Sequence, residues 1–223
     1  MMVKKCFWDN PYRHRLLTRV RRVDGDRVFL DETIFYPFSG AQESDAGSIA
    51  EYPVLRAIIE GNDIAYQLPE KHRLRAGSAA LVVIDWHRRY RLMRLHLAAE
   101  LVLELAGRAL TGVEKIGAHI SAEKARLDFL WPESVKPLLP RLSAQVEALV
   151  ARNQPVISAF ADPLTQRRYW EIEGFAQIPC GGTHLRSCGE IGKVTLKRIN
   201  IGRGKERIDI FVDEVAPPPP DPS

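Results

Sequence analysis

A cysteine and a histidine stand four residues apart in this sequence, on either side of two glycines, in Cys180-Gly181-Gly182-Thr183-His184. The glycines disfavour a helix and allow a tight loop in which both side chains turn towards one point. A thiolate sulfur and an imidazole nitrogen that converge on one point are typical ligands of zinc. Two ligands hold zinc weakly, so we expect the remaining ligands to come from another segment.

A second segment offers such ligands. The run 91–105 is rich in Leu, Ala, Met, Arg and Glu and contains no Pro or Gly, which predicts a helix. Between Leu95 and Leu103 its only polar residues are His96 and Glu100, which are four apart and so lie on one helical face, one turn from each other. Taken alone, this helix fits two interpretations: a local His96–Glu100 pair on a half-exposed surface, or half of a metal site.

The elements around these residues predict an α+β fold. Alternating or β-branched runs separated by turn residues make residues 1–84 a small N-terminal β-barrel-like domain. We expect an α/β domain with an antiparallel sheet and two main helices in residues 85–215, and a disordered proline-rich tail in 216–223. Asp85 is the expected N-cap of the first helix. The expected strands are 16–20, 27–30, 54–59, 79–84, 116–121, 125–129, 156–160, 193–199 and 207–212, and the expected helices are 86–109 and 133–152, the second with Pro137 and Pro140 near its start.

The composition is that of an ordinary globular chain. Of its 223 residues, 45% are hydrophobic and 27% charged, and no apolar run approaches the roughly 20 residues that span a bilayer. The amino terminus lacks the apolar core of a secretory signal, so we expect a cytoplasmic protein. Three cysteines give no disulfide framework, and a reducing compartment would keep Cys180 available as a metal-bound thiolate. The net charge of +4 favours a polyanionic partner.

Several further motifs occur in a fixed order along the chain. They are Asp31-Glu32-Thr33-Ile34-Phe35-Tyr36-Pro37, Ser39-Gly40-Ala41-Gln42 with Asp45-Ala46-Gly47, Asp85-Trp86-His87-Arg88-Arg89-Tyr90 followed by Met93-Arg94-Leu95-His96, and Glu190-Ile191-Gly192. With the Cys-Gly-Gly-Thr-His string, this order resembles the editing domain of alanyl-tRNA synthetases and the stand-alone alanyl-tRNA editing proteins of the AlaX type. The resemblance covers most of the chain, and the chain contains no synthetase catalytic segment, so we expect it to act in trans, without ATP.

Two departures from the family pattern touch its function. The family usually has a second histidine where this chain has Glu100, which affects the metal site directly. It also has more glycine where this chain has Ser39-Gly40-Ala41-Gln42, which affects the backbone near the substrate pocket.

The resemblance implies a Zn²⁺ cofactor held by His96, Glu100, Cys180 and His184. Glu100 then has two possible roles. It binds zinc in place of the family's histidine, because carboxylates are competent zinc ligands. Alternatively, it stays outside the ligand set and acts as general base towards the attacking water, which leaves three protein ligands and an open position. We favour ligation, because Glu100 lies where the family ligates.

The resemblance also implies a substrate: mischarged tRNA(Ala), carrying serine or, as second choice, glycine. Thr33 and Gln42 are the expected substrate-binding residues near the aminoacyl group, with Thr33 reading the serine hydroxyl. Outside this family, Thr33 would be an ordinary strand-edge residue and Gln42 a turn residue bonded to its own backbone.

Basic residues predict where the tRNA acceptor end binds. The candidates are three of the four arginines in the first turns of the predicted helix and four basic residues of the C-terminal hairpin: Arg88, Arg89, Arg94, Lys193, Lys197, Arg203 and Lys205. The run Arg167-Arg168-Tyr169-Trp170 combines cations with aromatic rings, which could stack on an RNA end or simply form a strand with one buried face.

Two other functions stay open. One is a related zinc deacylase for another misacylated tRNA, which the altered Ser39–Gln42 segment would allow. The other is a non-catalytic, zinc-containing RNA-binding module, in which Glu100 marks a degraded site.

Overall fold

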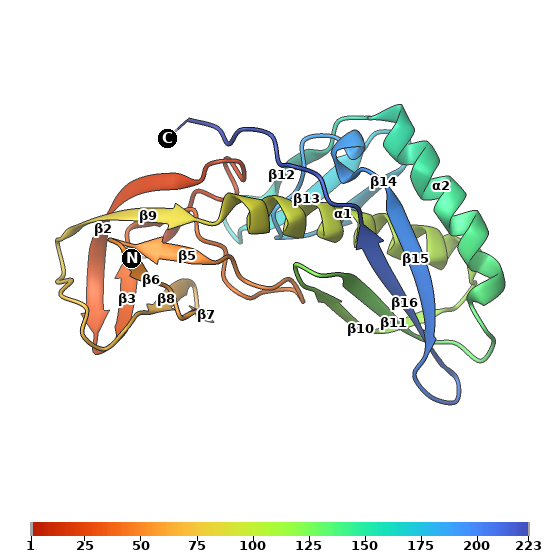
Figure 1. Ribbon diagram of the computed structural model, residues 1–223, viewed down its shortest axis with the longest axis horizontal. Helices are drawn as coiled ribbons and strands as arrows, with labels where there is room; N and C mark the ends of the chain where they lie inside the picture. The colour runs from red at the N-terminus through yellow and green to blue at the C-terminus, as the bar shows by residue number, and fades with distance from the viewer. Residues whose placement is uncertain (1, 223) are drawn as a thin grey trace. The chain divides into compact units, whose positions relative to one another are not determined.

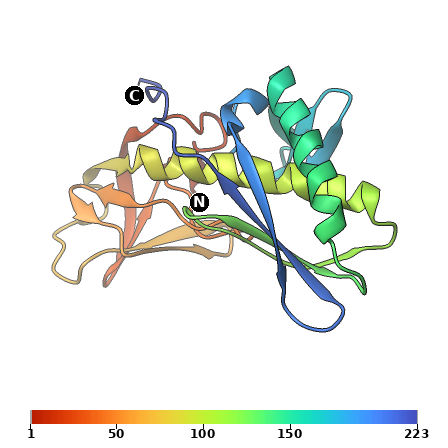
Figure 2. The same cartoon turned by 45° about the vertical axis from the view of Figure 1, so that its right-hand side comes forward.

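The computed structural model describes residues 2–222 as an α+β fold, as predicted, and the chain divides into two compact units. Unit 1 comprises Met1–Tyr90 and Ala216–Ser223, and unit 2 comprises Arg91–Val215. Figures 1 and 2 show unit 1 mainly in red and orange and unit 2 mainly in green and blue.

Unit 1 is built on a seven-stranded antiparallel sheet in the order β6-β5-β9-β2-β3-β8-β7. The long strand β2 alternates as a half-buried strand should, with Leu16 and Val20 buried and Leu17 70% exposed. The end strands β6 and β7 do not pair with each other in the part of the chain that the structure describes, so the predicted barrel is a curled, open half-barrel. The strands are β2 (Arg15–Asp24), β3 (Arg27–Leu30), β5 (Gly47–Ile49), β6 (Tyr52–Pro53), β7 (Arg56–Glu60), β8 (Asp63–Gln67) and β9 (Ala79–Ile84), beside a parallel pair β1 (Lys4–Lys5) and β4 (Glu32–Thr33).

The proline-rich tail is ordered against unit 1. The carbonyl of Pro218 accepts a hydrogen bond from Trp86 Nε1 at 2.7 Å, and the amide of Asp221 donates to the carbonyl of Tyr12 at 3.1 Å. Asn10 Nδ2 also donates to the Asp221 carboxylate at 2.9 Å. The prediction of a disordered tail is therefore wrong for residues 216–222, because prolines lack an amide donor but keep the carbonyl acceptors that the unit uses.

Helix α1 (Trp86–Ala109) begins after Asp85, as predicted, and continues from unit 1 into unit 2. The Asp85 carboxylate caps it by accepting a hydrogen bond from the Arg88 amide at 3.1 Å. Its leucines at 92, 95, 97 and 101 are all fully buried, as is Val102. A helix that is buried on every side cannot carry unpaired polar groups cheaply, so His96 and Glu100 require partners from other elements.

Unit 2 contains two antiparallel sheets. The larger has the order β10-β11-β16-β15, and the smaller has the order β12-β13-β14. Alternate residues of the larger sheet, such as Leu127, Phe129, Ile208 and Ile210, form its buried face. The strands are β10 (Glu114–Ile120), β11 (Ala125–Leu130), β12 (Ile157–Asp162), β13 (Arg167–Ile172), β14 (Ala176–Pro179), β15 (Val194–Asn200) and β16 (Lys205–Val212).

The second helix, α2 (Leu139–Arg152), lies beside β15 (Figures 1 and 2). It starts later than the predicted Glu133, after a 3₁₀ turn at Lys136–Leu138. Pro140 is the reason, because its ring and missing amide are tolerated only in the first turn of a helix.

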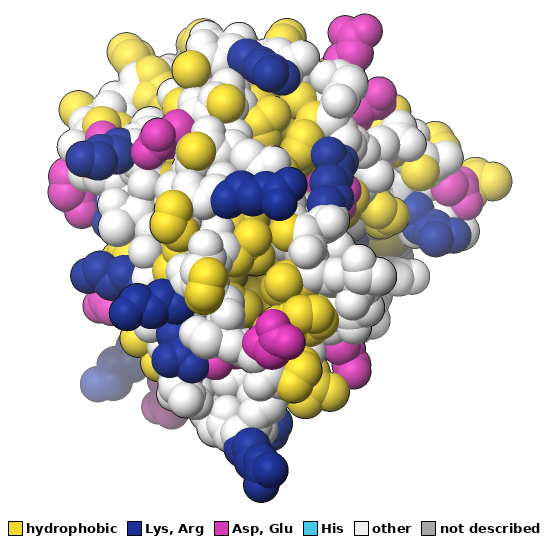
Figure 3. Space-filling view, turned by 90° about the vertical axis from the view of Figure 1, so that its right-hand side faces the viewer, with side chains coloured by type: hydrophobic (Ala, Val, Ile, Leu, Met, Phe, Trp, Pro, Cys, Tyr) yellow, Lys and Arg dark blue, Asp and Glu magenta, His cyan; other side chains and the backbone are white. Residues whose placement is uncertain are grey.

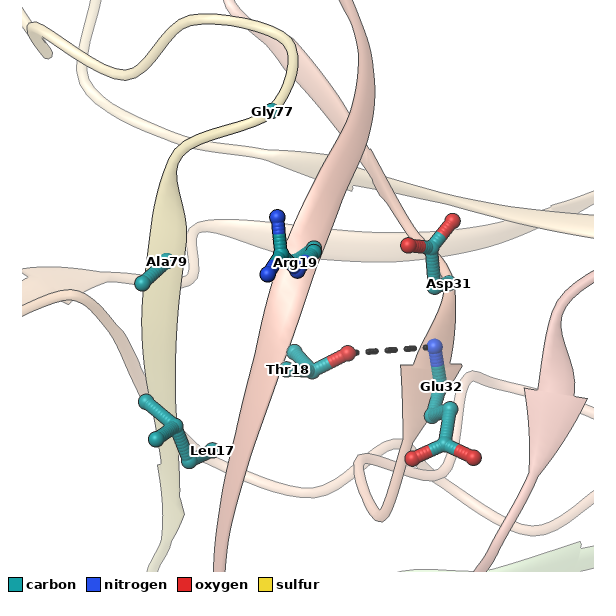
Figure 4. A pocket seen from close by; sticks show the side chains of 7 residues that line it. All are labelled: Leu17, Thr18, Arg19, Asp31, Glu32, Gly77 and Ala79. Atoms are coloured by element: carbon teal, nitrogen blue, oxygen red, sulfur yellow. Dashed lines mark hydrogen bonds between the residues drawn. The ribbon is translucent and has the colours of Figure 1, made fainter.

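A cavity of about 540 Å³ lies on the sheet of unit 1, and Thr18, Arg19 and Asp31 are among the residues that line it (Figure 4). Thr18 Oγ1 accepts the amide of Glu32 there at 3.1 Å. None of the predicted site residues lines this cavity.

Among the described residues, no helix is both long and apolar enough to cross a bilayer.

Candidate metal centre

Unit 2 brings the four predicted ligands together. One donor atom from each of His96, Glu100, Cys180 and His184 lies within 4.8 Å of the other three. His96 Nε2 is 3.3 Å from Glu100 Oε1 and 3.5 Å from Cys180 Sγ, and His184 Nε2 is 3.4 Å from Glu100 Oε2. Both oxygens of the Glu100 carboxylate therefore face imidazole nitrogens.

Two elements position these side chains. Helix α1 presents His96 and Glu100 one turn apart, and the loop after β14 presents Cys180 and His184. Hydrogen bonds fix the loop: the Cys180 amide donates to the carbonyl of Arg168 at 2.9 Å, and the Gly182 amide donates to Cys180 Sγ at 3.4 Å. Neither glycine of the loop is among those with positive φ, so the loop turns without the unusual dihedrals that its glycines would permit.

A fifth residue, Ser158 on β12, orients one imidazole. Its Oγ lies 3.2 Å from His184 Nδ1, so His184 is held with Nε2 towards the cluster. Hydrogen bonds to the outer nitrogen of a histidine fix the ring and its tautomer in metal sites. The sequence alone gave no indication of Ser158, because a serine in a strand, 26 residues from its partner, belongs to no local pattern.

The electrostatics of the cluster favour charged groups at all four positions. Burial opposes the charged form of His96, but Glu100 and Cys180 outweigh it and hold its pKa well above the ordinary value. Burial also opposes charge on Glu100 and Cys180, yet the two imidazoles lower the pKa of the carboxyl and bring the pKa of the thiol to about 7. The pKa of His184 is raised in the same way, against burial, by Cys180 and Glu100.

Two buried atoms of the cluster lack a hydrogen-bond partner. They are Glu100 Oε2 and His184 Nε2, which face each other at 3.4 Å without hydrogen-bond geometry. Buried polar atoms without partners are costly, and a metal ion between the side chains would satisfy both. Ligands around a tetrahedral zinc, with bonds of about 2.0 to 2.3 Å, lie about 3.3 to 3.6 Å apart. The separations of 3.3, 3.4 and 3.5 Å given above match that spacing, so these residues fit a zinc-type ion.

The other two cysteines are outside the site. Cys6 and Cys188 are buried, and burial raises the pKa of both thiols, that of Cys188 to about 11. Cys180 alone among the three has a lowered pKa, which is the property that a metal-binding thiolate needs.

Thr33 is fully buried in unit 1, where its hydroxyl is engaged on two sides. Its Oγ1 accepts the amide of Phe35 at 3.1 Å and lies 2.7 Å from the hydroxyl of Tyr66. Because Tyr66 donates to the carbonyl of Phe35 at 3.0 Å, the Thr33 hydroxyl donates to Tyr66. Thr33 keeps one lone pair, so it could only accept a hydrogen bond from a further group.

Gln42 is also fully buried in unit 1. Its backbone exchanges hydrogen bonds with Ser39 at 2.9 and 3.1 Å, across Gly40 at φ 57° and Ala41 at φ 73°. Two central residues with positive φ define the tight turn that usually requires glycine or asparagine. The departure from the family's glycine-rich pattern therefore places an alanine in a left-handed conformation.

Two of the arginines predicted to bind RNA are structural, which corrects that prediction. Arg89 is fully buried, ion-paired with Asp45, and donates to the carbonyls of Pro11 and Ile34 at 2.9 and 2.6 Å. Within unit 1 it thus fixes the segment between Thr33 and Gly47. From the sequence alone, an arginine at the start of a helix is expected to be exposed to solvent. The carbonyl groups to which Arg89 donates are brought near it only by the tertiary fold.

Arg94 has the same role in unit 2, where it is 1% exposed and donates to the carbonyl of Ile191 and to Asp213. This contact explains the Glu190-Ile191-Gly192 motif: a Cβ at Gly192 would lie 2.7 Å from Arg94 Nη2 and 2.8 Å from Asp213 Oδ1. Arg88 is half-buried in unit 1 and pairs with Glu43 at 2.7 Å.

The remaining basic residues of that prediction are exposed. They lie just before β15, on β15, in the turn that follows it and at the start of β16, respectively: Lys193, Lys197, Arg203 and Lys205. Figure 3 shows the side of the molecule that is on the right in Figure 1. On this side, Lys and Arg side chains are scattered among hydrophobic ones. In the run 167–170, Trp170 belongs to the core, whereas Arg167 is exposed.

The fold and donor set define this chain as an α+β protein with a cluster of four residues that could hold a metal ion. Comparison with known proteins extends that class. The chain is 32% identical to the alanyl-tRNA editing protein AlaX-M of Pyrococcus horikoshii, over 95% of this chain and 99% of that protein. It is 30% identical to AlaX-M of Saccharolobus solfataricus over 93% of this chain and 98% of that protein. It is also 33% identical to alanine–tRNA ligase of Staphylothermus marinus, over 86% of this chain and 24% of the ligase. A search of family models found no match.

This chain belongs to the family of AlaX-M alanyl-tRNA editing proteins.

Proposed function

We propose that this protein hydrolyses the ester between a wrong amino acid and tRNA(Ala), with serine as the main target and Zn²⁺ as cofactor. The observation that carries the proposal is the convergence of His96, Glu100, Cys180 and His184, with two buried donor atoms that lack partners. The names of the relatives, alanyl-tRNA editing proteins, supply the substrate class.

The metal would supply Lewis acidity, polarising the ester carbonyl and lowering the pKa of bound water. The chain's own residues hold and orient it. Cys180 is poised as a thiolate near neutral pH by the two imidazoles, and Gly182 donates to its sulfur. Ser158 holds Nδ1 of His184 by a hydrogen bond, which orients Nε2 towards the metal. An aminoacyl ester is already activated, so modest catalysis suffices.

We propose that Glu100 is a metal ligand. Both of its oxygens lie 3.3 to 3.4 Å from the nitrogens of His96 and His184, a spacing suited to a shared ion. Its side chain is 15% exposed, so the alternative role, taking a proton from the attacking water, also has solvent access. Glu100→Ala separates the two roles. Lost metal would exclude the base role, and retained metal with lost turnover would exclude ligation.

Thr33 is the proposed reader of serine. With its proton given to Tyr66, Thr33 Oγ1 can accept the hydroxyl proton of a seryl group. Alanine lacks that donor and would leave the pocket's polar atom unpaired, which supports strong discrimination against alanine. Gln42 is proposed beside it as a second substrate-binding residue.

The RNA would be held mainly by electrostatic attraction. Lys193, Lys197, Arg203 and Lys205 are exposed on one hairpin and are the proposed phosphate contacts. Each phosphate contact that is removed should weaken binding and reduce its salt dependence.

The test is deacylation of Ser-tRNA(Ala), Gly-tRNA(Ala) and Ala-tRNA(Ala), paired with metal analysis of the same preparation. We expect zinc at one equivalent, rapid release of serine and slow release of alanine. A panel of other misacylated tRNAs addresses the related-deacylase alternative, which would show a preferred substrate elsewhere. RNA binding without turnover on any substrate would instead establish a non-catalytic module.

A further inference from the structure

A basic segment of unit 1, residues 69–78, joins β8 to β9 (Figure 1). It carries three cations at every second position, Lys71, Arg73 and Arg75, and a single acid, Glu70. Three positive charges against one negative charge leave this segment with a net charge of +2. Neither the predicted site nor the proposed function uses these residues.

The side chains of the segment alternate between solvent and core. Lys71, Arg73 and Arg75 are exposed, whereas His72 and Leu74 between them are half-buried. Leu74 packs against the hydrophobic core of unit 1. This alternation is that of an extended segment with one face on the protein, so the three cations share the face that is turned to solvent.

Hydrogen bonds hold the segment to the rest of unit 1. His72 Nε2 lies 3.1 Å from the carbonyl oxygen of Gly25, and the Arg73 amide donates to the Tyr52 hydroxyl at 3.3 Å. At the end of the segment, the Gly77 amide donates to the carbonyl of Val20 at 2.7 Å. A segment that is already fixed loses little conformational entropy when it binds a partner, which favours affinity.

The three cations have no acidic partner. Among the described residues, none forms an ion pair with Lys71, Arg73 or Arg75. Other solvent-accessible cations of unit 1 do have such partners: Lys4 and Arg27 lie 2.8 and 2.7 Å from carboxylate oxygens. The segment therefore presents positive charge that nothing on the protein compensates.

The arrangement suits a row of phosphates. Cations at every second position of an extended segment repeat about every 7 Å, a spacing that successive phosphates of a nucleic acid strand can match. Stable binding to a membrane surface takes an apolar anchor beside the charges. Leu74, the large apolar residue of the segment, is turned towards the core instead.

We propose that residues 69–78 bind the phosphate backbone of the RNA through Lys71, Arg73 and Arg75. The inference rests on the proposed function, because it takes the RNA substrate as the partner. The two arginines offer paired N–H donors to phosphate oxygens, and the lysine offers a point charge. Unit 1 thereby contributes to RNA binding separately from the basic hairpin of unit 2.

The test compares two variants with the same loss of charge. The first removes the unpaired cations: Lys71→Gln, Arg73→Gln and Arg75→Gln together. The control removes three cations of unit 1 that lie within 4.0 Å of carboxylates: Lys4→Gln, Arg22→Gln and Arg27→Gln together. The probe is uncharged, fluorescently labelled tRNA(Ala), and its affinity is measured by anisotropy from about 50 to about 200 mM salt.

The first variant should lose both affinity and salt dependence. One phosphate contact contributes about 0.7 to 0.9 to the slope of log K against log salt, so its loss weakens binding about four- to sixfold at about 0.15 M salt. Three lost contacts should weaken binding roughly 50- to 170-fold and lower the slope by about 2 to 3. The control should bind within about threefold of the parent, because salt screens charges that make no contact. Equal losses in the two variants, or no loss in the first, would overturn the proposal.

Two further measurements keep the result specific. Arg73→Gln alone should weaken binding about four- to sixfold, so a triple variant that melts at a lower temperature does not decide the outcome. Vesicles rich in phosphatidylserine test the other polyanionic surface. If the parent binds these vesicles through the segment while all variants bind RNA like the parent, the partner is a membrane and the proposal is wrong.

This proposal and the proposed function can fail separately. If misacylated tRNA(Ala) is hydrolysed but the first variant binds tRNA(Ala) like the control, only the RNA-binding segment is wrong. If the first variant loses affinity as expected and no misacylated tRNA is hydrolysed by the parent, the segment stands and the editing activity is wrong.

Discussion

Ser158→Ala should weaken metal binding without removing any ligand. The serine holds His184 through one hydrogen bond of 3.2 Å to Nδ1, and without it the imidazole is free to rotate or to protonate the wrong nitrogen. Loss of such an outer partner lowers metal affinity by about 10- to 100-fold. Ser158 is exposed, so water can take the place of its hydroxyl, and we expect the lower end of that range, about tenfold or 1.4 kcal/mol.

The assay is competition for Zn²⁺ against a chromophoric chelator near neutral pH, with the parent protein and Ser158→Thr as controls. Ser158→Thr keeps the hydroxyl, so this variant should bind the metal with an affinity within about threefold of the parent. A threefold change is only half of the tenfold effect on a logarithmic scale, so the two variants can be distinguished. Parental affinity in Ser158→Ala would refute the role of this hydrogen bond. Equal losses in Ser158→Ala and Ser158→Thr would point to packing of β12 instead.

Three further outcomes follow from the structure. Ala41→Gly should stabilise unit 1 by about 0.5 to 1 kcal/mol. It relieves the strain of a left-handed alanine at φ 73°, and this gain exceeds the cost of the higher conformational entropy that glycine gives the unfolded chain. A lower melting temperature of the variant would contradict this prediction. Thr33→Val should reduce the preference for seryl over alanyl ester by at least about tenfold, whereas Thr33→Ser should keep it; an unchanged ratio of kcat/KM in Thr33→Val would exclude Thr33 as the reader. In metal-free protein, Cys180 should be alkylated with a midpoint near pH 7, because its lowered pKa keeps the thiolate above that pH and loses it below, while Cys188, with a pKa raised to about 11, should stay unmodified; mass spectrometry across pH gives both.

The sequence predicted those parts of the site that depend on local spacing. His96 and Glu100 share a face because any helix places residues four apart together, and helix 86–109 was evident from its composition. Cys180 and His184 were evident because few residue types bind zinc. The structure adds that their loop and that helix meet, which rests on tertiary packing that no single segment encodes.

Other features depend on partners distant in sequence and could not be predicted. Arg89 and Arg94 looked like surface cations in the sequence. The carbonyl groups to which they donate, those of Ile34 and Ile191, lie 55 and 97 residues away along the chain. Ser158 gave no local signal for the same reason. The late start of α2 could have been anticipated more firmly, since Pro140 excludes a helix that begins a full turn earlier.

The ordered carboxyl-terminal segment constrains how the protein can be shortened. Trp86 is 8% exposed, and its indole nitrogen donates to Pro218. Truncation at residue 216 would remove that acceptor from the first residue of helix α1, and the loss of one such hydrogen bond costs about 0.5 to 1.5 kcal/mol. Residues 217–222, which look like an expendable linker, are thus a fitted part of unit 1, and affinity tags are better joined beyond them than substituted for them.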